Sequence, residues 1–314
     1  MIIEKYYKKK TVLVTGGCGF IGSHLVEALV QLGASVYVID NLSTGQLKHI
    51  ERYLPFVTFI KGDILDYQLC FKMVKHVDLI FHLAARTSAP ESFLKPLEYH
   101  QNNVLGTLHL LDAARQHNTR SLILSSSAAV YGAMTAPQAI SEQTPCAPLS
   151  PYGYSKLCAE HYCSLYTRCY DLTTICLRYF NVYGPRQKNV LSIFSNQCKK
   201  NNPITLYGSG KQTRDFVPVH TVVHANLLTG AAYSTGITNT IFNIGTGQCR
   251  SINTILSLIQ AYYPHSCSPI HYAHETQYAD IEHSQANIDN YATLCTRYNS
   301  PPPTPPLTIQ ESLE

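Results

Sequence analysis

A glycine-rich turn near the N-terminus constrains the fold of this 314-residue chain more than any other feature. Residues 11–15 (TVLVT) have the pattern of a buried strand, and residues 21–32 have helical periodicity. Between them, Gly16, Gly19 and Gly22 fit GxxGxxG. Such a turn lets the backbone approach a pyrophosphate, and it places the phosphates at a helix N-terminus. The alternative is a tight turn without a ligand, but the strand–turn–helix setting favours a dinucleotide site.

The same alternation continues along the first half of the chain. Further strands are expected at 35–39, 57–60, 78–81, 121–125 and 173–178, and helices at 66–74, 98–117 and 152–170. This order predicts an α/β fold, a Rossmann-type doubly wound parallel sheet with helices on both faces. After residue 178 the pattern becomes turn-rich and predicts a smaller C-terminal substrate-binding lobe. We therefore divide the chain into a dinucleotide-binding domain (1–178) and a substrate lobe (179–314), with 215–250 returning to the first domain.

Composition excludes several classes of protein. The chain is 45% hydrophobic, which rules out intrinsic disorder. Its net charge of +4 comes largely from the first ten residues, so we expect no nucleic-acid partner. No apolar run approaches the ~18 residues of a membrane span, and the N-terminus does not resemble a signal peptide. The 11 scattered cysteines form no CxxC pair. They predict free thiols, no metal site and a cytoplasmic location.

Acidic and small residues follow the next strands, where a cofactor bound at the glycine turn would extend. Asp40 ends the second strand, and a carboxylate there accepts hydrogen bonds from ribose hydroxyls and repels a 2′-phosphate. It favours NAD over NADP, unless Asp40 is only a turn residue. Asp63 either meets the adenine or caps a helix, and His82 is either structural or a contact. The cofactor-binding residues expected are Gly16, Gly19, Phe20, Ile21, Gly22, Asp40, Asn41, Asp63, Ile64, Leu83, Ala84, Ala85, Tyr152 and Lys156, to which the family resemblance described below adds Asn103.

Three residues have the spacing and setting of a proton-transfer site. Tyr152 and Lys156 are four residues apart, so they share one face of the expected helix. A phenol is a weak base at neutral pH, but a nearby ammonium and an oxidised nicotinamide lower its pKa. Ser127 ends the fifth strand, where its hydroxyl can bond both a substrate and Tyr152. By itself Ser127 would equally fit a polar strand end without chemistry.

Together these motifs resemble those of the extended short-chain dehydrogenase/reductases, in particular the NAD-dependent nucleotide-sugar epimerases. The resemblance covers residues 11–313 and rests on TGGCGFIGSHL, DNLSTG, GDI, HLAA, NNVLGT, SSSAAVYG, SPYGYSK, LRYFNVYGPRQ, GSGKQTRDFVPV, FNIGTG and ADIEHSQANI. It implies that Ser127, Tyr152 and Lys156 are catalytic and that Asn103 supports them. It also implies C4 epimerisation of a UDP-sugar through a transient 4-keto intermediate, with no net change of NAD.

The resemblance also narrows the substrate. Ala128 and Ala129 stand where similar dehydratases and decarboxylases carry acids, which favours a simple epimerase. Asn181 matches a residue that contacts the diphosphate-sugar, and Arg214 matches an arginine that clamps the diphosphate, unless Arg214 pairs with an acid on the surface. Tyr207 matches a position near the uracil, or it packs in the core.

One position bears on the choice of sugar. Ser284 stands where hexose-only epimerases carry a bulky tyrosine, so room is left for a 2-acetamido group. We expect UDP-N-acetylglucosamine/UDP-N-acetylgalactosamine interconversion, with UDP-glucose/UDP-galactose as a further pair. Two departures affect binding: Gln277 replaces a second diphosphate arginine, which Lys211 or Arg250 would have to replace, and the loop after Gln187 is short.

Other outcomes remain open at this point. An enzyme of the same fold can release its keto product, and a non-catalytic dinucleotide sensor would share the fold as well. The resemblance further implies a role in polysaccharide biosynthesis. It also implies a homodimer in which the helices near 98–117 and 152–170 form a four-helix bundle.

Overall fold

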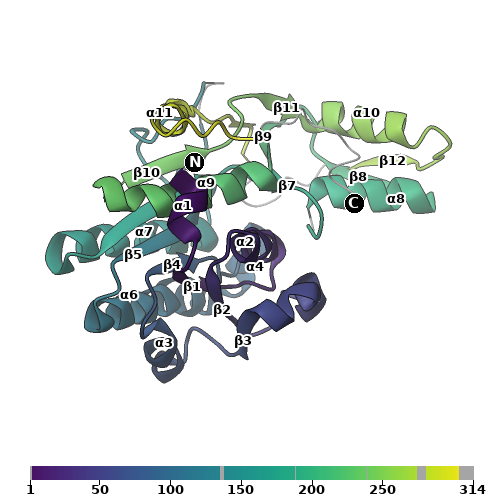
Figure 1. Cartoon of the computed structure of the whole chain (residues 1–314). Helices are drawn as coiled ribbons and strands as arrows, with labels where there is room; N and C mark the ends of the chain where they lie inside the picture. Colours follow the sequence, from purple (N-terminus) through teal and green to yellow (C-terminus); the bar gives the residue numbers. More distant parts are fainter. Residues whose placement is uncertain (1, 135–137, 188, 239, 274–280, 304–314) are drawn as a thin grey trace.

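A computed structural model describes residues 2–134, 138–187, 189–238, 240–273 and 281–303. A seven-stranded sheet, in which every neighbouring pair is parallel, forms the larger part of the molecule (Figure 1). Its order is β10-β6-β5-β4-β1-β2-β3. The strands are β1 (Thr11–Thr15), β2 (Ser35–Asp40), β3 (Val57–Lys61), β4 (Leu79–His82), β5 (Ser121–Ser127), β6 (Thr173–Tyr179) and β10 (Thr240–Ile244). The predicted Rossmann-type sheet is confirmed.

Helices cover both faces of this sheet because successive strand residues point to opposite sides. Val12 and Val14 of β1 join one core cluster, and Leu13 joins the other. The first cluster includes side chains of α1 (Ile2–Tyr7), α2 (Phe20–Gln31), α9 (Val219–Ala232) and α11 (Asp289–Arg297). The second includes side chains of α3 (Tyr67–Val74), α6 (Gly106–His117) and α7 (Pro151–Tyr170).

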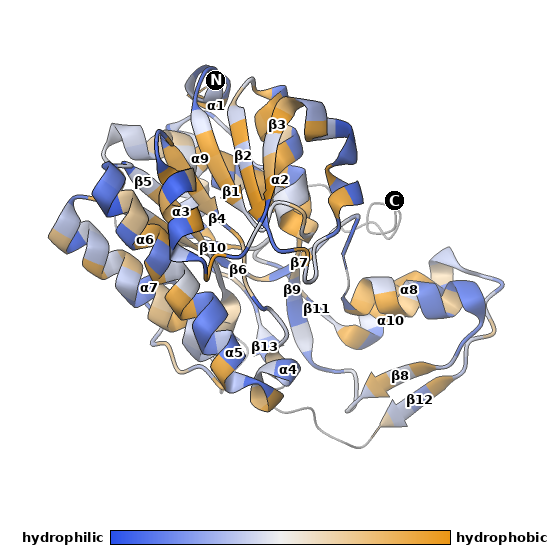
Figure 2. Cartoon of the chain, turned by 90° about the horizontal axis from the view of Figure 1, so that it is seen from below, coloured by the Kyte–Doolittle hydropathy of each residue, from blue (hydrophilic) through white to orange (hydrophobic). Residues whose placement is uncertain are grey.

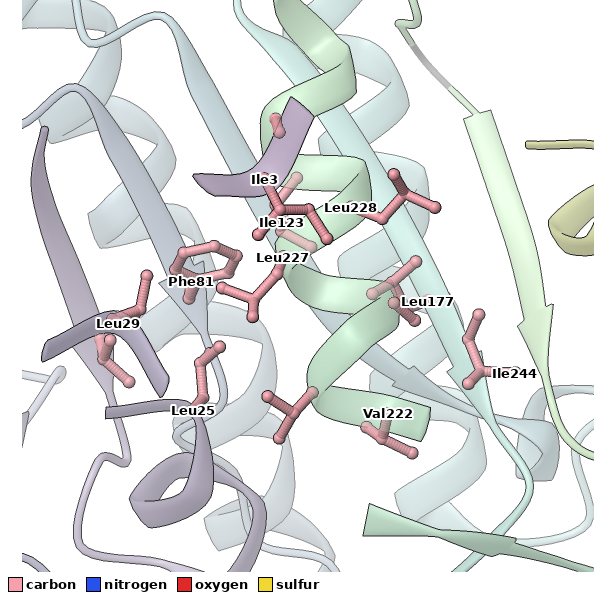
Figure 3. Packing of buried hydrophobic residues seen from close by; sticks show 14 of the residues in the cluster. Ile3, Leu25, Leu29, Phe81, Ile123, Leu177, Val222, Leu227, Leu228 and Ile244 are labelled. Atoms are coloured by element: carbon pink, nitrogen blue, oxygen red, sulfur yellow. The ribbon is translucent and has the colours of Figure 1, made fainter. Parts of the chain in front are cut away.

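Helix α9 lies across the middle of the sheet although it comes from the second half of the chain. In Figure 3 its Val222, Leu227 and Leu228 lie among Ile123 of β5 and Leu177 of β6. Nearly every residue of α9 is buried. Each fully buried valine or leucine side chain contributes about 1.5–3 kcal/mol to the stability of the fold. The C-terminal half therefore completes the core of the sheet domain as well as forming the second lobe.

The smaller lobe consists of two helices beside a short parallel pair of strands, and Figure 2 shows it set apart from the sheet domain. Its elements are α8 (Val190–Lys200), α10 (Ile252–Tyr262), β8 (Ile204–Tyr207) and β12 (Ile270–Ala273). Their apolar side chains form a core of their own. A further sheet connects the two parts; its strands are β7 (Asn181–Tyr183), β9 (Thr213–Pro218), β11 (Cys249–Ser251) and β13 (His283–Ser284).

Some elements differ from the sequence-based expectation. The helix expected at 98–117 is interrupted: α5 (Pro96–His100) leads into a π-helical turn at Gln101–Leu105 and then into α6. The helices α1, α4 (Ala89–Leu94), α8, α9, α10 and α11 were not expected. Short 3₁₀ turns occur at Leu47–His49, Glu51–Phe56, Ala128–Val130 and Tyr233–Thr235.

Two general features complete the fold. Among the described residues, no helix is both long enough and apolar enough to cross a bilayer. All 11 cysteines are free, as expected, and six of them are buried as small apolar side chains.

Candidate active site

A cleft of about 1500 Å³ lies at the carboxyl ends of the parallel strands, facing the smaller lobe. Each of the strands β1 to β6 contributes residues at or just after its end, and α8, β8 and β9 form the opposite wall. Ligands of doubly wound sheets bind in this position. The volume exceeds the ~300–1,000 Å³ of typical single-ligand pockets. The cleft therefore has room for a dinucleotide and a second ligand together.

The glycine turn is shaped for close approach. Gly16 has φ +72°, and a Cβ there would lie 2.7 Å from the backbone nitrogen of Ala84. A Cβ on Gly22 would overlap the carbonyl oxygen of Gly16, so the start of α2 packs directly on the turn. Gly19 is the N-cap of α2 and offers no side chain to its first amides. Those N–H groups and the helix dipole are thus available to a phosphate.

The acids after β2 and β3 shape the next part of the cleft. Asp40 is buried and accepts hydrogen bonds from the backbone N–H groups of Cys18 (2.9 Å) and Leu42 (2.8 Å). Asn41 donates to Asp63 at 2.8 Å, which joins the two strand ends. Asp63 is not a helix cap, because Asp66 caps α3. Both acids line the cleft, as do Phe20, Ile21, Ile64, Leu83, Ala84 and Ala85.

Ser127, Tyr152 and Lys156 meet on the cleft wall. Ser150 caps α7 and Pro151 is its first residue, so Tyr152 lies in the first turn of the helix. Ser127 ends β5 and its hydroxyl interacts with the Tyr152 phenol. Burial raises the pKa of Tyr152, and the interaction with Ser127 lowers it. The phenol thus stays protonated at neutral pH until a further positive charge is nearby.

Lys156 lies one helical turn deeper than Tyr152. Its ammonium donates to the carbonyl oxygen of Ser125 at 2.9 Å, and the side chain is buried. Burial lowers the pKa of Lys156 to about 8, and Glu160 opposes this shift. The ammonium is therefore present at neutral pH and is lost as the pH rises through about 8.

Asn103 and His82 support the site from behind and do not line the cleft. Asn103 lies in the π-helical turn and donates to Ser155 Oγ and to the carbonyl oxygen of Arg86, both at 2.9 Å. His82 bridges Thr15 (2.7 Å) and Thr107 (2.9 Å), and burial lowers its pKa to about 3. The structural alternative for His82 therefore holds: it is a neutral ring that ties β1 to α6.

Of the residues of the second half of the chain that were expected to bind the substrate, three line the cleft and one does not. Asn181, Tyr207 and Arg214 line the cleft, and Tyr207 is exposed rather than packed in the core. Asp215 does not pair with Arg214 in the surface ion pair considered above. Its carboxylate accepts instead from Thr246 Oγ1 and from the backbone of residues 246, 247 and 286.

Ser284 is buried and is not among the residues that line the cleft. It pairs with Arg214 across the parallel strands β13 and β9, so its side chain lies on the same face of this sheet. Ser284 thus lies beside a cleft residue, behind the wall. Gln277 lies outside the described residues.

Sequence reasoning missed two arginines in the cleft. Arg86 pairs with Glu98 at 2.7 Å, and Arg186 pairs with Glu27 of α2 at 3.3 Å. Arg186 has φ +69°, a conformation that sequence pattern does not reveal. In the segment after Gln187, residue 188 lies outside the described residues; Asn189 caps α8, whose first turn lines the cleft.

A model of the NAD dependent epimerase/dehydratase family matches residues 12–245, well over half of the chain. The chain belongs to this family. The predicted membership among the extended short-chain dehydrogenase/reductases and the predicted cofactor, NAD, are thereby confirmed. The glycine turn, the free N-terminus of α2 and the acid at the end of β2 are the features that this cofactor needs.

The chain is similar to several named proteins over most of their length. A putative UDP-glucose 4-epimerase of Methanocaldococcus jannaschii is 40% identical over 256 residues, 79% of this chain and 81% of that protein. Among solved structures, a UDP-N-acetylglucosamine 4-epimerase from Methanobrevibacter ruminantium, in complex with UDP-N-acetylmuramic acid, is 36% identical with a TM-score of 0.85, covering 91% and 92%. A UDP-glucose 4-epimerase of Thermus thermophilus, solved with NAD, is 32% identical with a TM-score of 0.86, covering 96% and 97%.

Proposed function

We propose that this family member is a UDP-sugar 4-epimerase. The observation that carries the proposal is that Ser127, Tyr152 and Lys156 come together in the wall of a cleft large enough for two ligands. The residues after Ser127 are Ala128 and Ala129, so no acid stands there to eliminate water or assist decarboxylation. A site with one proton-transfer group suits removal and return of a single proton.

The residues divide the chemistry as follows. Tyr152 removes the proton of the sugar 4-hydroxyl, and Ser127 holds that hydroxyl and the phenol in line. The ammonium of Lys156 stabilises the phenolate that Tyr152 must form. The glycine turn and Asp40 would hold NAD, which when bound would supply reversible hydride transfer at C4. Tyr152 then gives its proton back to the C4 oxygen, which leaves no net oxidation.

The two parts of the chain divide the ligands. In this proposal residues 1–178 hold NAD, and the part from residue 179 onward holds the UDP-sugar. The segment at 215–250 contributes α9 and β10 to the sheet domain. Arg214 supplies a planar fork of donors for the diphosphate. Asn181 and Tyr207, on the same cleft wall, bind the diphosphate-sugar and the uracil.

We further propose UDP-N-acetylglucosamine and UDP-N-acetylgalactosamine as the preferred pair, with UDP-glucose and UDP-galactose as a second pair. The small side chain of Ser284 supports this choice. It lies on β13 next to Arg214 of β9 and just behind the cleft wall, where a bulkier residue would push into the wall. The Methanobrevibacter protein described above is named for the N-acetyl sugar.

The test offers the purified protein equal amounts of UDP-N-acetylglucosamine and UDP-glucose and follows the anomeric protons by NMR. Equilibration of the N-acetyl sugar with its C4 epimer is the expected result. Conversion of glucose alone would refute the choice of sugar and leave the epimerase standing. Accumulation of NADH with a keto sugar would mean an oxidase-like outcome, and bound NAD with no turnover would favour a sensor.

We also propose a homodimer. Helices α4, α5 and α7 and the π-helical turn present a row of exposed apolar side chains: Leu94, Leu97, Leu105, Tyr154 and Leu165. Leu94 and Leu97 are 83% and 77% exposed, which is costly for two neighbouring leucines in water. Pairing of this face with its copy would bring two helices of each chain, the continuous α5–α6 segment and α7, together in a four-helix bundle.

A further inference from the structure

A buried ion pair lies directly behind the catalytic residues, and the mechanism above does not use it. Glu160 of α7 binds Arg178 of β6 through both oxygens, at 3.0 Å to Nε and 2.6 Å to Nη2. Ser126 Oγ donates to the same carboxylate at 2.5 Å. All three side chains are almost completely buried.

The position of this carboxylate links the three elements that build the active site. Tyr152, Lys156 and Glu160 are spaced four residues apart and lie on one face of α7. Ser126 and Arg178 are paired residues of the neighbouring strands β5 and β6, so their side chains share the face under α7. Glu160 therefore ties the strand end that carries Ser127 to the helix that carries Tyr152.

The carboxylate also acts on the charge of Lys156. The titratable groups that interact with this ammonium are Glu160 and Cys163 of α7, His82 of β4 and Cys176 of β6. Glu160 is the carboxylate among them. It counteracts the burial that lowers the pKa of Lys156 to about 8.

We propose that Glu160 is a positioning residue of the epimerase: it keeps Lys156 in its ammonium form and holds the Ser127 strand end against α7. This inference rests on the proposed function, in which Lys156 stabilises the Tyr152 phenolate. A stabilising role alone accounts poorly for the pair, because buried ion pairs are often no more stabilising than apolar residues of similar volume. The negative charge of Glu160 instead favours the ammonium form of Lys156, one turn away in α7.

The test removes the charge and keeps the shape. In Glu160→Gln, the alkaline limb of the kcat/KM profile is expected to move down by about 1 pH unit, the low end of the ~1–3 units that an opposite charge supplies, because Arg178 shares the carboxylate. The sign follows from Lys156: its ammonium is required and is lost as pH rises, so a lower pKa brings the loss to lower pH. A limb that stays in place overturns the proposal.

Arg178→Lys is the matched control. It keeps both charges but loses the two-pronged contact, so it lowers the melting temperature and leaves the alkaline limb at the wild-type pH. A limb shifted equally in both variants would mean a purely structural role and would refute the inference. If Glu160→Gln does not fold, Glu160→Gln with Arg178→Met leaves no unpaired buried charge, and the limb is expected to remain shifted.

A second readout does not depend on turnover. The pKa of Lys156 is measured by NMR titration of ¹³Cε-labelled lysine, with its signal assigned by its absence in Lys156→Arg. A lower pKa in Glu160→Gln supports the electrostatic role of Glu160, and an unchanged pKa overturns it. Absence of epimerisation by the wild-type protein would refute the proposed function separately.

Discussion

At the scale of single residues, Gly16 shows how much of the cofactor site depends on one missing Cβ. The position combines a left-handed backbone with backbone atoms of Leu83 and Ala84 within 3 Å of where a side chain would begin. Left-handed conformations cost a non-glycine residue about 1–2 kcal/mol, and here the neighbouring backbone cannot move aside. The glycine is therefore required for both the turn and the approach of NAD.

Gly16→Ala is expected to weaken NAD binding at least tenfold. It should also lower the free energy of unfolding by more than the cost of a left-handed alanine alone. Gly33→Ala is the matched control, because Gly33 has φ +77° but no atom within 4 Å of its would-be Cβ. The control should lose about 1–2 kcal/mol of stability and bind NAD normally. Isothermal titration and urea unfolding measure both quantities, and equal NAD affinity in the two variants would contradict the expectation.

Tyr152→Phe is expected to reduce kcat by about 10²–10⁴-fold, the usual contribution of a positioned acid–base group. NAD binding should persist, since the phenyl ring keeps the packing against Tyr99. Tyr154→Phe removes an exposed phenol from the same turn of α7 and should leave kcat unchanged. NMR assays of epimerisation give kcat for both; a Tyr152→Phe enzyme that retains most of its rate would exclude Tyr152 as the base.

At the scale of elements, the sheet of β11, β9 and β13 brings Arg250, Arg214 and Ser284 into one row across three strands. Arg250 stands directly opposite Arg214, and facing like charges are unfavourable unless an anion lies near them. The sequence alone left Lys211 and Arg250 as candidates to replace the charge missing at Gln277. The register favours Arg250, because Lys211 is exposed in the turn before β9.

Arg250→Met is expected to raise KM for the UDP-sugar about tenfold with little change in kcat, because a contact to the diphosphate is made equally in the ground and transition states. Lys211→Met should leave KM unchanged. Steady-state kinetics at fixed pH and salt compare the two variants. The reverse ranking would show that Lys211 supplies the charge.

The interrupted helix before α6 shows a different element-scale effect. A regular helix was expected at 98–117, but the π-helical turn at Gln101–Leu105 inserts extra backbone where Asn103 must reach Ser155 and Arg86. Such turns are common at functional sites, and residue periodicity does not predict them. At this interruption the hydrophobic periodicity predicted a regular helix, whereas the contacts of Asn103 are made from a π-helical turn.

At the scale of the whole molecule, the exposed apolar face predicts association. Leu94→Asp with Leu97→Asp is expected to convert a dimer to monomers, since each charge would be buried in the interface. Phe56→Asp, a 65% exposed apolar position outside this face, is the control and should not change the mass. Light scattering after size exclusion measures the mass, and a wild-type monomer would refute the proposed dimer.

Local patterns were sufficient for much of the protein. The glycine turn, the alternation of strands and helices and the four-residue spacing of Tyr152 and Lys156 are short-range features, and short-range sterics and hydrophobic periodicity govern them. The family and NAD followed from these motifs. The boundaries of β1 to β6, the strands that were expected, differ from the expected ones by at most two residues, whereas β7 to β13 were not expected.

Tertiary structure decided the contacts that join distant segments. It alone places Ser127 against Tyr152, engages Asp215 with the turn at 246–247 rather than with Arg214, and sets Ser284 behind the cleft wall. The four-residue spacing of Tyr152, Lys156 and Glu160 is present in the sequence, but the pairing of Glu160 with Arg178 is not evident there. Pairings across tens of residues depend on strand order and register, which arise from packing of the whole core rather than from any local pattern.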